Sequence, residues 1–377
     1  MFLSKFLSFL LLVGVTRASF QDHNIPQSNA LVTVKAFDVG SMSLANSTHS
    51  FYLPVLPGRE TITAPMYAFL VEHQATGKRV MFDLGIRKDP SNLAPSLGAA
   101  FVSGAYQLNQ TRDILQQLQD GGITLASIDT VIWSHSHFDH IGDMSKFPNS
   151  TNLLIGPGTV VSTYPENPNA TLLASDFAGH NVTELDFTHS KLVFSGLTAI
   201  DYFRDGSFYL LDTPGHMSGH ISALARVTPT TFVSLSADTL HHAGQARPRP
   251  AFQNNFPCPA HLVHELKSSV STDYFWSPKS QVGAFDIKSR AQQMLAISDL
   301  PDAFYEFPVP AQVSLEKMAT FDADPDFLMV FSHDRSVRGT LPVFPKSLNN
   351  WKVSGLKERT VWNFADPSNP AWLFSAN

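Results

Sequence analysis

The chain has 377 residues, of which 43% are hydrophobic and 15% are charged, so it can bury a large core and is not expected to be disordered. Its formal net charge is −6 and it contains no long run of lysine or arginine, which argues against a nucleic-acid partner. The single cysteine, Cys258, excludes an internal disulfide. No histidine or aspartate flanks Cys258 to activate its thiol, so we expect a structural role for it.

Residues 1–18 have the features of a secretory signal peptide. Lys5 precedes a short apolar run, and small residues around Ala18 match a cleavage site. The run is too short to cross about 30 Å of hydrocarbon, so we expect no stable membrane association. Five glycosylation sequons agree with a secreted or secretory-pathway glycoprotein. They begin at Asn46, Asn109, Asn149, Asn169 and Asn181.

The spacing of apolar residues and the positions of turn residues predict the following helices and strands, in chain order. The first half is expected to contain strands over 31–37, 67–72, 79–83 and 130–134, with a helix over 111–120. The second half is expected to contain strands over 207–212, 221–225, 231–235 and 327–331, with helices near 288–298 and over 311–320. No linker divides the chain into independent domains.

The segment Ser134-His-Ser-His-Phe-Asp-His140 follows the strand expected over 130–134. On an extended turn His135 and His137 point the same way, while Asp139 and His140 can turn toward a neighbouring point. A histidine-rich surface loop is the alternative, but four potential ligands at this spacing favour a metal site. The arrangement suits two cations a few ångströms apart.

Further ligand-type residues follow other predicted strands. His216 ends Asp-Thr-Pro-Gly-His, Asp238 ends Ser-Ala-Asp, and His333 follows Ser332. Each signal is weak alone, because a histidine after a strand is more often structural. Together they complete two groups of three ligands and one carboxylate that both groups can share.

These motifs give the sequence a resemblance to the metallo-β-lactamase superfamily, whose signature is His-x-His-x-Asp-His. Within it, the segments SHSHFDHIGD, TPGHMSGH, SADT and FSHD are similar to the N-acyl-homoserine-lactonase branch and its secreted fungal relatives. The resemblance implies an α/β fold, the αββα four-layer sandwich, over residues 31–350. It also implies an insertion at about 242–300 and a C-terminal extension over 351–377.

The resemblance also implies a ligand set for two zinc ions per chain and no other cofactor. One zinc would be held by His135, His137 and His216. The other would be held by Asp139, His140 and His333. Asp238 would bridge the two ions, and Asp83 would brace the ligand loop without binding metal.

The remaining histidines are expected to support the site or lie elsewhere. We expect His220 to be structural, and His241 and His242 to be pocket wall or supporting residues. Those expected at the surface are His23, His49, His261 and His264. The aromatic residues of the insertion could pack it onto the core or line a pocket, and packing is favoured. They are Phe252, Phe256, Tyr274, Phe275 and Trp276.

The expected reaction is attack of a metal-bound hydroxide on a carbonyl carbon, with Asp139 carrying a proton to the leaving group. A lactone or related cyclic ester is the first candidate among small acyl substrates. A lactam or a thioester is the alternative, and a metal-binding protein without catalysis is the alternative of a different class. Large apolar side chains of residues 242–300 are expected to reach over the metal face and wall the pocket.

Overall fold

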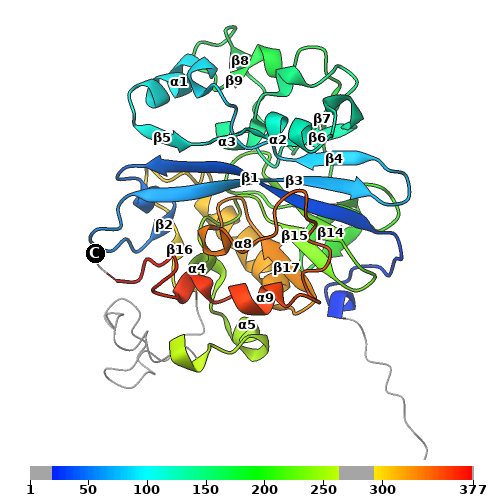
Figure 1. The fold of residues 1–377 in the computed structure, drawn as a ribbon, viewed down its shortest axis with the longest axis vertical. Coiled ribbons are helices and arrows are strands. Elements are labelled where there is room, and N and C mark those ends of the chain that lie inside the picture. The colour runs from blue at the N-terminus through cyan, green and yellow to red at the C-terminus, as the bar shows by residue number, and fades with distance from the viewer. Residues whose placement is uncertain (1–18, 263–292, 376–377) are drawn as a thin grey trace, which may run out of the picture.

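The computed structural model describes residues 19–262 and 293–375, so the expected signal peptide lies outside the described residues. Two β-sheets pack face to face, and helices cover both outer faces (Figure 1). This arrangement confirms the expected αββα sandwich. Among the described residues, no helix has the length and apolar character needed to span a bilayer.

The two large sheets contain all eight strands expected from the sequence. In spatial order the first sheet consists of β10 (Val182–Glu184), β7 (Asn152–Ile155), β6 (Thr130–Ile132), β4 (Arg79–Phe82), β3 (Ile62–His73), β1 (Val32–Leu44) and β5 (Tyr106–Asn109). The second sheet consists of β11 (Leu192–Phe194), β12 (Leu197–Asp201), β13 (Phe208–Asp212), β14 (Ile221–Arg226), β15 (Phe232–Leu235) and β17 (Phe327–Val330). Two short sheets pair β16 (Ala296–Ile297) with β2 (Tyr52–Leu53), and β8 (Thr163–Tyr164) with β9 (Leu172–Leu173).

Apolar side chains fill the space between the sheets. Phe69 on β3 and Phe82 on β4 meet Leu210, Val233 and Leu328 from the second sheet. Alternate side chains of a strand face opposite sides, and helices cover the outer faces, so the central strands are buried on both sides. This double burial explains why they appear in the sequence as nearly continuous apolar runs.

Helices complete the outer layers. Within residues 19–262 and 293–375 the α-helices are α1 (Pro95–Val102), α2 (Ile114–Asp120), α3 (Phe138–Ile141), α4 (Ala243–Ala246), α5 (Pro250–Asn255), α8 (Pro308–Ala323) and α9 (Leu356–Thr360). The Asp113 side chain caps α2 by accepting a hydrogen bond from the backbone N–H of Gln116. Met318 and Phe321 of α8 pack against Phe327 on the outer face of the second sheet.

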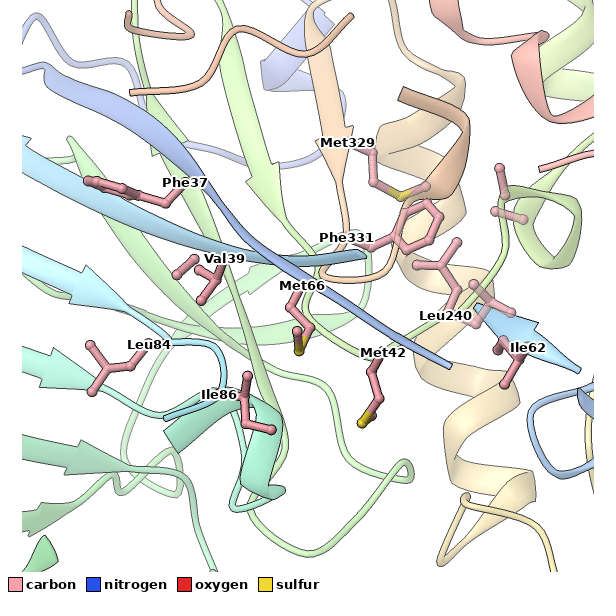
Figure 2. Close-up of a cluster of buried hydrophobic side chains, with 14 of the residues drawn as sticks. Phe37, Val39, Met42, Ile62, Met66, Leu84, Ile86, Leu240, Met329 and Phe331 are labelled. Carbon is pink, nitrogen blue, oxygen red and sulfur yellow. The ribbon is translucent and has the colours of Figure 1, made fainter. Parts of the chain in front are cut away.

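A hydrophobic cluster supports the loops that follow the strands at one end of the sandwich. Figure 2 shows Leu84, Leu240 and Phe331 in this cluster, each of them within two residues of a predicted site residue. The loop after β6 is also tied to the second sheet, because the backbone N–H of Ile221 donates to the Ser134 carbonyl, at 2.8 Å. The site loops therefore rest on a packed apolar base.

The helix expected near 288–298 is wrong over its described part. None of residues 293–298 is helical: 294–295 form a bend and 296–297 form β16, which pairs with β2, while 288–292 lie outside the described residues. Met294, Leu295 and Ile297 are buried in the core, so tertiary packing and strand pairing decide their conformation. Residues 351–375 also pack on this core, where Trp351 and Trp362 are buried.

Candidate metal centre

The structure brings all seven predicted ligand residues together. Their potential ligand atoms form one group from His135, His137, His216 and Asp238, and a second from Asp139, His140 and His333. Within each group the ligand atoms lie within 4.8 Å of one another. The residues come from loops after β6, β13, β15 and β17, as the sequence predicted. Asp238 also groups with His333 and His241, a residue that the sequence assigned to the pocket wall.

Three ring nitrogens converge in the first group. Nδ1 of His137 lies 3.0 Å from Nε2 of His135 and 3.0 Å from Nε2 of His216. In a tetrahedral zinc site with bonds of about 2.0–2.1 Å, neighbouring ligand nitrogens are separated by roughly 3.3 Å. The three rings therefore already have close to the spacing of such a site.

Asp238 lies between the two groups. Its Oδ2 is 3.4 Å from Nε2 of His216 and 3.2 Å from Nε2 of His333, while its Oδ1 is 3.3 Å from Nε2 of His140. Asp139 completes the second group, with Oδ2 at 3.5 Å from Nε2 of His333. A carboxylate in this position can bind one cation through each oxygen.

Two buried atoms at the centre lack a hydrogen-bond partner among the described residues. These are Nε2 of His140 and Oδ1 of Asp238, which face each other without the alignment of a hydrogen bond. Buried polar atoms are nearly always satisfied, and metal ligation would satisfy both. The residues present therefore fit a centre with two cations.

The electrostatics also favour cations. Burial lowers the pKa of His137 to about 4 and lowers the pKa of His135 and His216 well below the usual value, so these rings are neutral ligands at pH 7. Burial opposes charge on His140 as well, but the carboxylates of Asp238, Asp83 and Asp139 outweigh it and raise the pKa of His140. A bound cation would take the place of that proton.

Hydrogen bonds outside the centre orient several ligand rings. Asp83, directly after β4, accepts from the Ser134 backbone N–H at 2.7 Å and from Nδ1 of His140 at 2.9 Å. Asp83 has a φ of 61°, a left-handed backbone conformation that residues other than glycine rarely adopt. Nδ1 of His333 donates to the Pro65 carbonyl at 2.8 Å. These contacts give Asp83 the bracing position expected for it and aim each Nε2 at the centre.

The other histidines divide into supporting and remote residues. His220 accepts a hydrogen bond from the Asp238 backbone N–H at 3.1 Å, which places the carboxylate-bearing loop. His242 faces away from the centre and lies 2.9 Å from the Ala371 carbonyl. His261 is exposed as expected, whereas His264 lies outside the described residues.

The expectation of a surface position for His23 is wrong. Its Nε2 lies 2.9 Å from the Asp324 carboxylate, and its ring packs against Phe321 and Phe327. The carboxylate gives the buried imidazole a polar partner, so burial does not leave it unsatisfied.

A small cavity of about 50 Å³ lies over four of the ligands, His137, Asp139, Asp238 and His333. Its walls are almost entirely apolar and come from β1, β3 and the loops beside them. Residues other than the predicted ligands that line it are Met42, Leu44, Phe51, Ile62, Ala64, Tyr106, Phe138, His241 and Phe304. The position expected for His241 in the pocket wall is confirmed.

The expectation that residues 242–300 wall the pocket is wrong for their described parts, 242–262 and 293–300, which do not line the cavity. This segment packs elsewhere: Phe252 is buried and lies 5.5 Å from Trp362, ring centre to ring centre. Packing is thus confirmed for Phe252 and Phe256, while residues 274–276 lie outside the described residues. Burial raises the pKa of Cys258 to about 12, in keeping with a structural thiol.

The residues that line the cavity wall carry no motif, so the sequence alone did not indicate them. Met42 and Leu44 lie on β1 beyond the predicted end of that strand, and Ile62 precedes the predicted start of β3. The available signals were the apolar residues past residue 37, whose alternation shifts after Asp38, and the alternating Ile62, Ala64 and Met66 before residue 67. They would have lengthened both strands. They would not have shown that the ends of these strands line a cavity.

A family model and several known proteins match the sequence of this chain. Residues 65–324 match the family model described as "Metallo-beta-lactamase superfamily". The chain is 35% identical to metallo-hydrolase mfmC of Annulohypoxylon moriforme, covering 92% of this chain and 90% of that protein. It is 33% identical to γ-lactamase FDB1 of Fusarium pseudograminearum, covering 92% and 84%. It is also 35% identical to cytochrome P450 monooxygenase mpaDE of Penicillium roqueforti, of which it spans only 38%.

Solved structures with the same fold include lactone hydrolases. A mutant of B. thuringiensis AiiA with N-decanoyl-L-homoserine at its active site has a TM-score of 0.53 and 17% identity, covering 85% of this chain and all of that one. An N-acyl homoserine lactone hydrolase with its product at the catalytic metal centre also has a TM-score of 0.53, with 18% identity over 85% of this chain and 100% of its own. The family model and the relatives matched over most of their length show that this chain belongs to the metallo-β-lactamase superfamily.

Proposed function

We propose that this chain is a secreted dinuclear zinc hydrolase that opens a lactone or a related cyclic ester. The observation that carries the proposal is the pair of ligand groups sharing Asp238 at the floor of an apolar cavity. In this assignment the first zinc is bound by His135, His137 and His216. The second is bound by Asp139, His140 and His333. Mixed histidine and carboxylate ligation without thiolate suits zinc.

Bound zinc ions supply a water of lowered pKa as nucleophile and polarise the carbonyl oxygen. The chain supplies the rest. Asp139 lines the cavity beside His333, so its carboxylate can pass a proton to the leaving oxygen. The apolar walls, including Phe51 and Phe304, exclude bulk water from the reacting bond.

The cavity favours a small, neutral, apolar ring. Its described lining contains no lysine or arginine that would bind an anionic group. Opening a lactone expels an alkoxide, which is a better leaving group than the amide anion expelled from a lactam and needs a weaker proton donor. The γ-lactamase relative FDB1, matched over 84% of its length, makes a γ-lactam the second candidate, ahead of a thioester.

Elemental analysis and a matched substrate pair test the proposal. We expect two zinc ions per chain, and faster hydrolysis of γ-octalactone than of the lactam of the same ring size and side chain, after correction for intrinsic reactivity. Faster cleavage of the lactam would make a cyclic amide, and not a lactone, the preferred substrate class. Less than one metal equivalent after purification with added zinc would contradict the dinuclear centre. Bound zinc without turnover of lactone, lactam or thioester would leave a metal-binding protein without catalysis.

Export and glycosylation belong to the same proposal. All five sequon asparagines are exposed in the structure, as an oligosaccharide acceptor must be. We expect a mature N-terminus near Ser19 or Phe20 in protein from the native host, and a lower apparent mass after endoglycosidase treatment. An intact Met1 on that protein would contradict export.

A further inference from the structure

A second cleft lies at the other end of the first sheet from the metal centre, and its volume is about 410 Å³. Strands β4, β6 and β7 run parallel, and the cleft lies where they begin, whereas the metal ligands follow the ends of strands. We call it the sheet-end cleft. The residues that line it are Lys78, Val80, Asp129, Thr130, Asn152, Tyr202, Phe203 and Arg204. The proposed hydrolysis uses none of them, so the cleft needs a separate explanation.

One of the five sequon asparagines lies beside the sheet-end cleft. Asn181 immediately precedes β10, and β10 pairs in parallel with β7, whose first residue is Asn152. The backbone carbonyl of Asn181 accepts from the Leu153 N–H at 3.0 Å, and its side-chain Nδ2 donates to Oδ1 of Asn152 at 3.1 Å. Asn181 therefore lies one strand beyond the cleft residue Asn152, in the same row.

The orientation of the Asn181 amide follows from its neighbours. Nδ2 of Asn152 donates to the Asp129 carbonyl at 3.1 Å, so Oδ1 of Asn152 is the atom that faces Asn181. An acceptor needs a donor opposite it, which places Nδ2 of Asn181 there. This nitrogen is the atom that carries the sugar in an N-linked glycan. It keeps one hydrogen after glycosylation, so the contact with Asn152 can persist in the glycoprotein.

The sheet-end cleft extends away from Asn181 across the neighbouring strands. In the register of the parallel strands, Asn152 pairs with Thr130, and Thr130 pairs with Val80. Adjacent strands are about 4.8 Å apart, so the row from β10 to β4 covers roughly 14 Å. A chain of sugars that begins at Asn181 can follow this row into the cleft.

The lining suits a neutral sugar better than an anion. Lys78 and Arg204 are cations, but Asp129 in the same lining carries a negative charge that opposes an anionic ligand. The rings of Tyr202 and Phe203 add apolar surface. Charged hydrogen-bonding groups are thus combined with aromatic faces. A sugar ring has hydroxyl groups around its rim and an apolar face, so it matches both parts of this lining.

We propose that the sheet-end cleft holds the first sugars of an N-linked glycan on Asn181. The inference rests on the proposed export and glycosylation, and it assigns a structural role to one of the five sites. Covalent attachment gives these sugars a high effective concentration at the cleft, so docking needs only a modest intrinsic affinity. A docked glycan would also shield the start of β10, which is an open edge of the first sheet.

Protection from an endoglycosidase that cuts between the first two sugars tests the docking. Glycopeptide mass spectrometry measures release from each site of the native protein secreted by a fungal host. We expect release at Asn181 to be about tenfold slower than at Asn109, which lies on the opposite edge strand β5, because the enzyme reaches only undocked glycan. Denaturation should make the two rates equal. Arg204→Ala should speed release at Asn181, whereas Lys88→Ala, an exposed cation outside the cleft, should not.

The outcomes of this digestion are distinct. Equal release at Asn181 and Asn109 in the native protein would overturn the inference. An unoccupied Asn181 beside occupied sites elsewhere would overturn it and leave the proposed glycosylation standing. Five unoccupied sites would overturn both.

A pair of variants that leave Asn181 unaltered tests the effect of the glycan on stability. Thr183→Ala destroys the sequon Asn181-Val-Thr, and Thr183→Ser keeps it. In secreted protein we expect Thr183→Ala to melt about 2 °C or more below Thr183→Ser. The same pair made without glycosylation in a bacterial host should show no such gap. A gap of equal size in both hosts, or none in the secreted pair, would overturn the inference. Stabilisation of the unglycosylated protein by inorganic phosphate, lost in Arg204→Ala, would overturn it in favour of an anion.

Discussion

The floor and the wall of the cavity differ in both chemistry and origin. The floor is the exposed part of a centre of seven histidine and aspartate residues that follow strands, four of them in one six-residue motif. His137, Asp139, Asp238 and His333 are the members that line the cavity. The wall consists of apolar side chains from β1, β3 and separate loops, such as Met42, Ile62 and Phe304. Metal chemistry tolerates few residue types and spacings, whereas an apolar surface can be built from many. The floor thus determines the reaction class, and the wall determines which substrate fits.

The largest expected effect comes from the shared carboxylate of the floor. Asp238→Ala should abolish measurable hydrolysis and lower the zinc content below two ions per chain, because Asp238 lies against His216 of the first ligand group and His333 of the second. Elemental analysis and γ-octalactone kinetics measure the two effects. Asp212→Asn is the matched control, since Asp212 also ends a strand but belongs to neither ligand group. Full activity in Asp238→Ala would show that the ligand assignment is wrong.

A residue beneath the floor should have the next largest effect. Asp83→Ala removes the acceptor of His140 and of the Ser134 backbone, so the ligand loop loses its brace. We expect zinc affinity to fall about 10- to 100-fold, as for other supporting carboxylates behind metal ligands. Competition with a chromogenic chelator measures this affinity.

Asp83→Asn should cause a smaller loss of zinc affinity than Asp83→Ala. The amide keeps an acceptor for the Ser134 N–H but cannot accept from both Ser134 and His140 as a carboxylate does. An affinity between those of Asp83→Ala and the unaltered protein is expected. Equal affinity in all three proteins would mean that the floor does not depend on this brace.

The wall should behave differently from the floor. Phe304→Ala opens the apolar surface, and we expect KM for γ-octalactone to rise about tenfold with zinc content unchanged, since burying a large apolar side chain is worth about 1.5–3 kcal/mol. Steady-state kinetics measure the change. Phe252→Ala is the control: this ring packs on Trp362 away from the cavity, so its loss should lower the melting temperature without raising KM. If Phe304→Ala also lost zinc, the wall residues would contribute to metal binding, and the prediction that they affect KM alone would be wrong.

The same difference explains what could be predicted from the sequence. The motif from His135 to His140 is local, so its chemistry was visible without a structure. The contact of His241 with Tyr305 joins residues 64 positions apart, and that of Gln245 with Phe51 joins residues 194 positions apart. His23 is buried by Asp324, which is 301 positions away. Such contacts depend on how the sheets stack, and no single segment encodes them.

The smallest expected effect on zinc binding and catalysis lies at His242, next to the cavity residue His241 but turned away from it. Burial lowers the pKa of His242 to about 4, below the value of about 6.5 expected in the unfolded chain. Its Nδ1 accepts from the Gly244 N–H at 3.0 Å, and its Nε2 donates to the Ala371 carbonyl, so only the neutral ring fits. Because the unfolded chain takes up the proton first, this residue destabilises the fold as the pH falls from about 6.5 to about 4.

His242→Gln should remove this part of the acid sensitivity without changing zinc content or KM. In the window from pH 6.5 to 4, the free energy of unfolding of the unaltered protein should fall more steeply than that of the variant, by about 1.4 kcal/mol per pH unit for one histidine. Denaturant titrations of both zinc-loaded proteins at several pH values measure the two free energies of unfolding. The other buried histidines are present in both proteins, so their contribution cancels when one free energy is subtracted from the other. His261→Gln, at an exposed position, should leave the slope unchanged. If the free energy of unfolding falls with pH at the same rate in His242→Gln and in the unaltered protein, this prediction is contradicted. A loss of zinc in His242→Gln would show that His242 supports the metal centre.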